Sequence, residues 1–191
     1  QVGEAVGAVI GDEQLHDVLG SYQSQPQFIT TSVRPEYDGI WVTAHCETIS
    51  GMINDKSLPH HEQRPKQAAI DAVRLFLACA KEFKFHAHVA HISSSEEVEL
   101  VHQYNEENNR HGLYATCEVT PQALTLNVDN FTWDTGLTLK WSQQNPPIRT
   151  EAEMYALRND VKNKRIHIFA TDHAPHDPEE KEKGMSGMTQ A

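Results

Sequence analysis

Three short β-prone runs of this chain each lead into a side chain that can bind a metal ion. They are Ile40–Ala44 followed by His45, Phe85–Ala90 followed by His91, and Ile166–Phe169 followed by Asp172. An apolar run that stops at His or Asp is typical of a buried parallel strand that delivers polar groups to a pocket at its C-terminal end. Burying such groups is unfavourable unless a metal, a substrate or a hydrogen bond satisfies them. The pattern therefore predicts one site built from the ends of three strands.

Helical patterns separate these runs. Apolar residues recur at helical spacing over 65–81, with Pro65 suited to the first helical position. Ser94 and Glu97 predict a capping box at the start of the next helix. Strands that alternate with helices imply parallel strands with crossover helices, so the predicted fold class is α/β. The other expected elements are a helix at Asp12–Leu19, a strand or loop at Phe28–Val33, a strand at Leu113–Val119, a strand at Leu137–Trp141 and a helix at Glu151–Asn163.

Composition limits the classes of partner. The chain has 191 residues, which suits one domain, and a formal net charge of −11. That acidic balance disfavours nucleic acid and anionic membranes, since both need clustered Lys and Arg. No apolar run approaches the roughly 20 residues that span a bilayer, and no signal-peptide pattern opens the chain. The widely spaced Cys46, Cys79 and Cys117 are typical of reduced thiols, so a cytoplasmic location is expected.

His45, His91 and Asp172 carry the donor atoms that a divalent cation such as zinc prefers. Bound water would become acidic enough to act as a nucleophile near neutral pH, and Asp172 could take its proton. The alternative is that each histidine is a hydrogen-bonded core residue without a catalytic role. The pair His86 and His88 lies on one face of its strand and is expected to have a packing or supporting role. His60 and His61 are expected to be solvated loop residues.

Several segments together resemble dihydroorotases of the amidohydrolase superfamily over roughly residues 40–183. The matching segments, in chain order, are His45-Cys46-Glu47, Arg64-Pro65, His88-Val89-Ala90-His91-Ile92-Ser93, Glu118-Val119-Thr120-Pro121, Asn145-Pro146-Pro147-Ile148-Arg149, and Ala170-Thr171-Asp172-His173-Ala174-Pro175-His176 with Glu179-Glu180-Lys181. The Asp172 segment is the most specific of these, and the set in order is more specific than any member.

The resemblance implies that residues 1–191 form a single incomplete domain, part of a (β/α)8 TIM-type barrel without its N-terminal strands. It implies that His45, His91 and Asp172 are metal ligands, that Asp172 is also the catalytic base, and that a complete site holds two zinc ions. Asn145 and His176 would bind the substrate. The implied reaction interconverts N-carbamoyl-aspartate and dihydroorotate, a step of pyrimidine biosynthesis.

Departures from the family pattern keep other functions open. The family's first-strand His-x-His has no counterpart, and Gln122-Ala123 replaces a His-His pair. The bridging ligand of the fourth strand is also missing: if Gly7-Ala8-Val9 occupies that strand, its position is taken by Val9. A full barrel typically needs about 250 residues, so we expect the physical protein to be longer. The alternatives are a catalytically inactive dihydroorotase-like subunit that stabilises a partner enzyme, and an allantoinase or dihydropyrimidinase-like hydrolase. The sequence leaves a homo-oligomer open.

Overall fold

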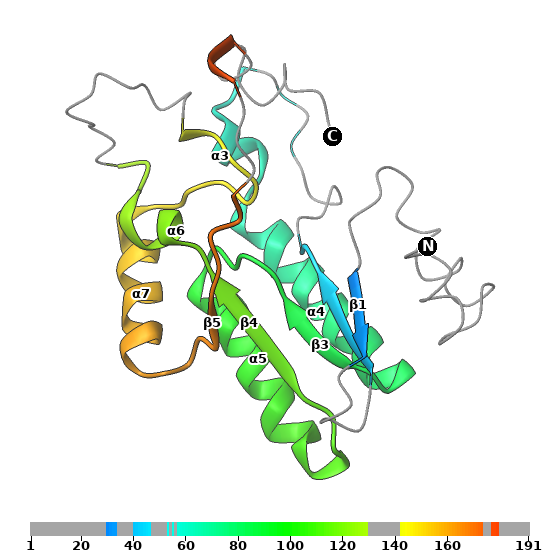
Figure 1. Ribbon diagram of the computed structural model, residues 1–191. Coiled ribbons are helices and arrows are strands. Elements are labelled where there is room, and N and C mark those ends of the chain that lie inside the picture. The colour runs from blue at the N-terminus through cyan, green and yellow to red at the C-terminus, as the bar shows by residue number, and fades with distance from the viewer. Residues whose placement is uncertain are drawn as a thin grey trace.

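The computed structural model describes residues 30–33, 40–46, 53, 55, 57–129, 142–173 and 177–179. These residues contain a five-stranded sheet with the strand order β1-β2-β3-β4-β5 (Figure 1). The strands are β1 (Thr30–Val33), β2 (Ile40–Ala44), β3 (His86–Val89), β4 (Ala115–Val119) and β5 (Ile168–Phe169). The pairs β2–β3, β3–β4 and β4–β5 are parallel, as the sequence predicts. The expected helix at Asp12–Leu19 and the expected strand at Leu137–Trp141 lie outside the described residues.

Strand β1 departs from the parallel arrangement, since it pairs antiparallel with β2. Of the two alternatives for Phe28–Val33, the described residues show a strand, at Thr30–Val33. Only residues 34–39 separate β1 from β2. A parallel neighbour needs a crossover of about a dozen residues or more, so this short connection permits only the antiparallel pairing.

Helices connect the parallel strands in the alternating order that the sequence predicts. They are α3 (His60–Gln63), α4 (Lys66–Phe83), α5 (Ser95–Asn108), α6 (Pro121–Thr125) and α7 (Glu151–Lys162), with a 3-10 turn η1 (Asn109–His111) after α5. The α/β prediction is therefore confirmed. Pro65 is the N-cap of α4 rather than its first residue, because its extended backbone (φ −62°, ψ 149°) leaves it outside the helix.

The start of α5 differs from the predicted capping box. Ser94 is the N-cap, but its side chain accepts no hydrogen bond from the first turn of the helix. Instead the carboxylate of Glu97 accepts bonds from the Ser94 hydroxyl (2.9 Å) and from the backbone N–H and hydroxyl of Ser93 (3.0 Å each). Glu97 is only 2% exposed, so these donors satisfy a buried carboxylate and not the helix end.

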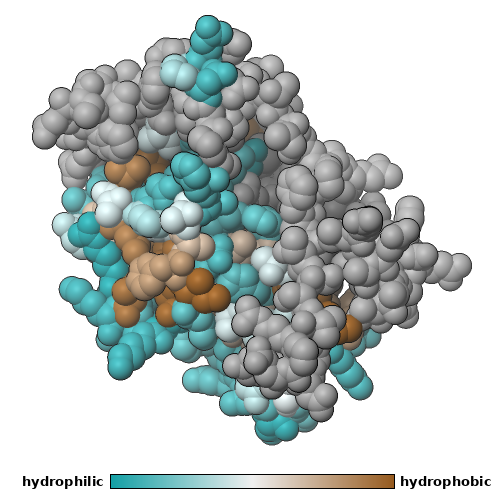
Figure 2. All heavy atoms as spheres, in the orientation of Figure 1, coloured by the Kyte–Doolittle hydropathy of each residue, from teal (hydrophilic) through white to brown (hydrophobic). Residues whose placement is uncertain are grey.

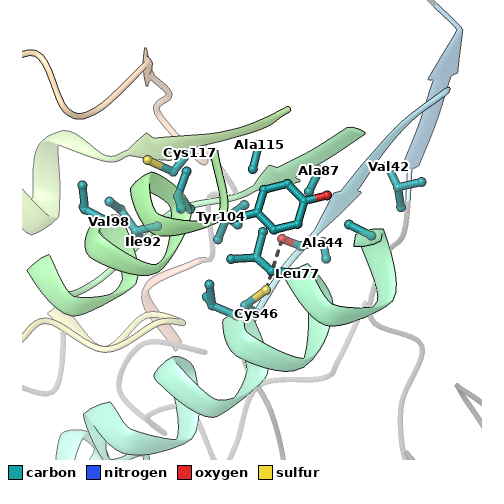
Figure 3. Packing of buried hydrophobic residues seen from close by; sticks show 14 of the residues in the cluster. Val42, Ala44, Cys46, Leu77, Ala87, Ile92, Val98, Tyr104, Ala115 and Cys117 are labelled. Carbon is teal, nitrogen blue, oxygen red and sulfur yellow. Dashed lines mark hydrogen bonds between the residues drawn. The ribbon is translucent and has the colours of Figure 1, made fainter. Parts of the chain in front are cut away.

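The hydrophobic core lies between the sheet and the helices α4 and α5 (Figure 3). Alternate residues of β2, β3 and β4 point into it, as a pleated strand requires. The strand residues of the core are Val42, Ala44, Ala87, Val89, Ala115, Cys117 and Val119, and the helices add Val73, Leu77, Ala80, Val98, Val101 and Tyr104. Fully burying a Val or Leu side chain contributes about 1.5–3 kcal/mol. This core therefore holds β2, β3 and β4 in place. The opposite face and the C-terminal ends of these strands carry the polar residues.

The prediction that Ile166–Phe169 forms a buried strand is confirmed only as a strand at Ile168–Phe169, and the expected burial is wrong. Strand β5 has two residues, and Ile168 and Phe169 are 43% and 62% exposed. Figure 2 shows apolar surface in this region, near α6 and α7. Among the described residues β5 pairs only with β4, so it is an edge strand with one uncovered side. In the described part of the chain, no helix is both long enough and apolar enough to cross a membrane.

Candidate active site

The face of the sheet opposite the core carries polar side chains. Thr43 of β2 pairs in register with His88 of β3, and His88 pairs with Thr116 of β4. These positions alternate with the core residues, so their side chains lie on the face away from α4 and α5. Glu118 lies two residues after Thr116 and shares its face. The sheet therefore presents a polar layer just below the C-terminal ends of three parallel strands.

His45 and His91 meet at those strand ends. His45 directly follows β2, and His91 lies two residues beyond β3. Nδ1 of His45 and Nε2 of His91 are 2.6 Å apart, and the two rings are tilted by 51°. His91 is only 3% exposed. Burial, together with the nearby His45, lowers the pKa of His91, while the negative charge of Asp172 opposes that shift. The buried imidazole is therefore held in its neutral form, the form that binds metals.

A second polar pair lies below these histidines. Nε2 of His88 is 3.0 Å from Oε2 of Glu118, and Nδ1 of His88 is 2.8 Å from the Thr116 hydroxyl. The hydrogen bond with His88 lowers the pKa of Glu118, although partial burial opposes it. The supporting role expected for His88 agrees with these contacts. His86 instead stacks between Trp41 and Tyr114, with ring centroids 4.9 and 5.5 Å away, which is a packing role.

Asp172 lies beyond the end of β5 and has a left-handed backbone, with φ of 45°. Its negative charge raises the pKa of His91, so Asp172 lies within electrostatic range of that ring. It is exposed, however, and the described residues contain no cluster of three His, Cys, Asp or Glu side chains at metal-binding distance. The structure thus brings two of the three expected ligands into contact. His176 lies outside the described residues.

Asn145 and His60 form a further polar pair near the strand ends. The Oδ1 atom of Asn145 and the Nε2 atom of His60 are buried, and the two side chains lie close enough to interact. Burial, aided by the charge of Arg64, lowers the pKa of His60 to about 4, and Asn145 opposes the shift. The expectation that His60 is a solvated loop residue is therefore wrong. It failed because the loop of residues 142–150 covers α3, which local sequence does not reveal.

The low pKa of His60 makes stability depend on pH. Between its unfolded value near 6.5 and its folded value of about 4, the unfolded chain binds the proton and the folded chain does not, so stability falls as the pH decreases. We expect His60 to remove about 2 kcal/mol of stability between pH 7 and pH 5. Urea unfolding of the wild type and of His60→Asn at pH 7 and pH 5 gives the free energy of unfolding of each protein at each pH. The wild type should lose about 2 kcal/mol more than the variant. An equal loss in the two proteins would contradict this prediction.

Arg149 connects three segments around the site. Its guanidinium donates through Nε and one terminal nitrogen to the Ser93 hydroxyl (3.2 Å each) and through the other to the Arg64 carbonyl (2.6 Å). Burial lowers the pKa of Arg149, and the charges of Glu97 and Glu153 oppose the shift. Arg64 precedes α4 and Ser93 follows His91 by two residues, so one side chain fastens the segment after Asn145 to the start of α4 and to the segment that follows β3. The sequence signal for it was the final residue of the Asn145–Arg149 motif.

Comparisons with known proteins show which enzymes the chain is similar to. No family model matches the chain. A dihydroorotase of Brevibacillus brevis is 33% identical over 156 residues, which cover 78% of this chain and 35% of that protein. A dihydroorotase of Lactobacillus helveticus is 35% identical over 177 residues, which cover 89% of this chain and 40% of that protein. The chain is a homologue of the dihydroorotases. This dihydroorotase homologue spans about two fifths or less of the length of these relatives.

Solved structures show the fold to which the homologue corresponds. A D-hydantoinase from Bacillus sp. AR9 matches with a TM-score of 0.60 and 23% identity, over 77% of this chain and 33% of that one. The L-hydantoinase (dihydropyrimidinase) from Arthrobacter aurescens matches with a TM-score of 0.56 and 26% identity, over 66% of this chain and 26% of that one. These proteins are amidohydrolases with TIM-type barrels, so the dihydroorotase homologue has the fold of one part of such a barrel.

Proposed function

We propose that this chain is part of a metal-dependent cyclic amide hydrolase, a dihydroorotase that interconverts N-carbamoyl-aspartate and dihydroorotate. The observation that carries the proposal is the contact between His45 and His91 at the ends of adjacent strands. The homology to dihydroorotases favours this substrate over other cyclic amides. The reaction is a step of pyrimidine biosynthesis, and three free cysteines fit a reducing cytoplasm.

The two histidines fit a zinc site. Zinc holds imidazole nitrogens at about 2.0–2.1 Å in a tetrahedral arrangement, which separates two such nitrogens by about 3.3 Å. The 2.6 Å between Nδ1 of His45 and Nε2 of His91 is close to that separation, so a small opening of the pair would suffice. Asp172 would be the third ligand, and two zinc ions are expected in the whole protein. Bound zinc would polarise the amide carbonyl and acidify water.

The chain's own residues would then carry the proton and hold the substrate. In the hydrolytic direction, Asp172 accepts the proton of the attacking water and returns it to the ring nitrogen as the amide C–N bond breaks. Asn145 and His176 bind the substrate, with His176 suited to its carboxylate. The Oδ1 atom of Asn145 is buried beside His60, and its polar character suits a role in ligand binding.

Turnover by the full-length protein tests the proposal. With zinc supplied, we expect hydrolysis of dihydroorotate at a kcat/KM at least about tenfold above that for hydantoin, because only dihydroorotate carries the carboxylate. The His111→Asn variant is a matched control. His111 is exposed and precedes β4, so it lies at the N-terminal ends of the strands, away from the candidate site. Preference for hydantoin would favour a hydantoinase-like enzyme, and no turnover of either substrate would contradict the proposal.

An inactive dihydroorotase-like subunit that stabilises a partner is the second candidate. The observation that favours it is the lack of a three-ligand cluster among the described residues. Metal analysis of the full-length protein separates the candidates. The enzyme should retain at least one equivalent of zinc per chain, whereas an inactive subunit should retain less than about one tenth of an equivalent.

A further inference from the structure

Glu118 of β4 contacts the main chain around His91 in two ways. Its Oε1 atom accepts a hydrogen bond from the backbone N–H of His91 (3.3 Å). Its own backbone carbonyl accepts one from the N–H of the next residue, Ile92 (2.9 Å). One residue on the neighbouring strand therefore binds two successive amides just beyond the end of β3. Together these bonds fix the direction in which the chain leaves the strand.

That direction is an unusual one. His91 has a positive φ of 31°, which is uncommon for residues other than glycine because the side chain crowds the backbone. Such a conformation persists only when surrounding contacts hold it in place. The amide N–H of Ala90 also bonds to the Ala44 carbonyl of β2 (3.1 Å), so the residues before and after His91 are tied to neighbouring strands. For His91 itself, the described side-chain acceptor is the Glu118 carboxylate.

The other oxygen of Glu118 is held by His88. Nε2 of His88 is 3.0 Å from Oε2, and Nδ1 of His88 is 2.8 Å from the Thr116 hydroxyl. If Nε2 carries the proton, Nδ1 accepts from the hydroxyl, and each polar atom in the series has a partner. The side chains of Glu118 and His88 are 16% and 13% exposed, so little water competes for these bonds. The carboxylate is therefore held in one position below His91.

We propose that Glu118 is a positioning residue, which holds the strained main chain of His91 so that Nε2 of its ring faces Nδ1 of His45. In the proposed zinc site, this orientation presents both nitrogens to one cation before the cation arrives. The expected effect of Glu118 on zinc affinity rests on the proposed function. The effect on the His91 amide follows from the hydrogen bond alone.

Two variants of nearly equal size separate the hydrogen bond from packing. Glu118→Gln keeps an oxygen that can accept from the His91 N–H, and His88 can change tautomer to face the new amide nitrogen. Glu118→Met fills the same space without an acceptor. Loss of an outer hydrogen-bond partner of a metal ligand typically lowers metal affinity 10–100-fold. In the full-length protein we expect a loss of zinc affinity of about that size for Glu118→Met, and of less than about threefold for Glu118→Gln.

Zinc affinity is measured by competition with a chromophoric chelator, and amide hydrogen exchange of the zinc-free protein reports on His91 directly. The His91 amide should exchange faster in Glu118→Met and at the wild-type rate in Glu118→Gln. Glu106→Ala, an exposed position on α5, is the control and should change neither quantity. If Glu118→Met does not fold, Glu118→Asp replaces it, since the shortened carboxylate cannot make both contacts.

The outcomes for the inference and for the proposed function differ. Equal zinc affinity in the wild type and Glu118→Met, or equal losses in the Met and Gln variants, would overturn the positioning role. A wild-type protein that binds no zinc would contradict the proposed function instead. In that case, unchanged exchange of the His91 amide in Glu118→Met would still overturn the inference, and faster exchange would support it.

Discussion

Replacing His91 with asparagine is expected to abolish zinc binding and to reduce turnover of dihydroorotate about 10³-fold or more. The imidazole supplies one of the two ligand nitrogens that face each other at the strand ends. A metal contributes several kcal/mol of transition-state stabilisation in such reactions, and about 4 kcal/mol corresponds to a factor of 10³ in rate. Asparagine is chosen because it tolerates a positive φ better than alanine, so the variant removes the ring with little added backbone strain.

Zinc content after dialysis and kcat/KM measure this effect in the full-length protein. His111→Asn is the control, because it removes an exposed histidine that lies before the N-terminal end of β4, away from the candidate site. Thermal unfolding of both variants without zinc shows whether the fold survives. Retention of wild-type zinc affinity by His91→Asn would contradict the assignment of His91 as a ligand.

Replacing Arg149 with methionine is expected to destabilise the protein by about 3 kcal/mol. Methionine has a similar length but donates none of the bonds to the Ser93 hydroxyl and the Arg64 carbonyl. It also removes the positive charge that favours the ionised form of buried Glu97. Removing one partner from a buried pair of opposite charges typically costs about 3–5 kcal/mol. The low end applies here because Arg149 is only partly buried.

Urea unfolding measures that loss. Arg74→Met is the matched control, since Arg74 lies on the outer surface of α4 with its side chain 60% exposed and pairs with Asp71. A surface substitution of that kind should change the free energy of unfolding by no more than about 0.5 kcal/mol. Arg149→Lys should recover part of the loss, because lysine keeps the charge without the planar fork. If Arg149→Met lowers the free energy of unfolding by less than about 1 kcal/mol, the segments that contain Arg64, Ser93 and Arg149 do not depend on the arginine side chain to stay together.

The parts of the fold that follow from local pattern could be predicted from the sequence. Strand β2 has the expected bounds, and α7 ends within one residue of them, because apolar periodicity and turn chemistry act over a few residues. The meeting of His45 with His91 could also be expected, since the C-terminal ends of parallel neighbours lie at one edge of a sheet. The direction of β1 was missed, although its six-residue connection to β2 requires it.

The contacts that tune the site could not be predicted in the same way. Glu118 and Arg149 were visible as members of motifs, but their partners lie 27 and 56–85 residues away in the sequence. The burial of His60 depends on a loop that begins more than 80 residues later. Such long-range packing leaves no periodic signal near the residue it affects. The roles of Asp172, Asn145 and His176 rest on resemblance and stay predictions.

The hydrogen bond from Arg149 to the Arg64 carbonyl also has a consequence for synthesis on the ribosome. At about 5–20 residues per second, Arg149 emerges roughly 4–17 seconds after Arg64. Strands β2, β3 and β4 and helices α4 and α5 precede Arg149 in the chain, so they can pack while translation continues. The order of synthesis therefore allows His45 and His91 to stand on a packed scaffold before Arg149 fastens the segment after Asn145.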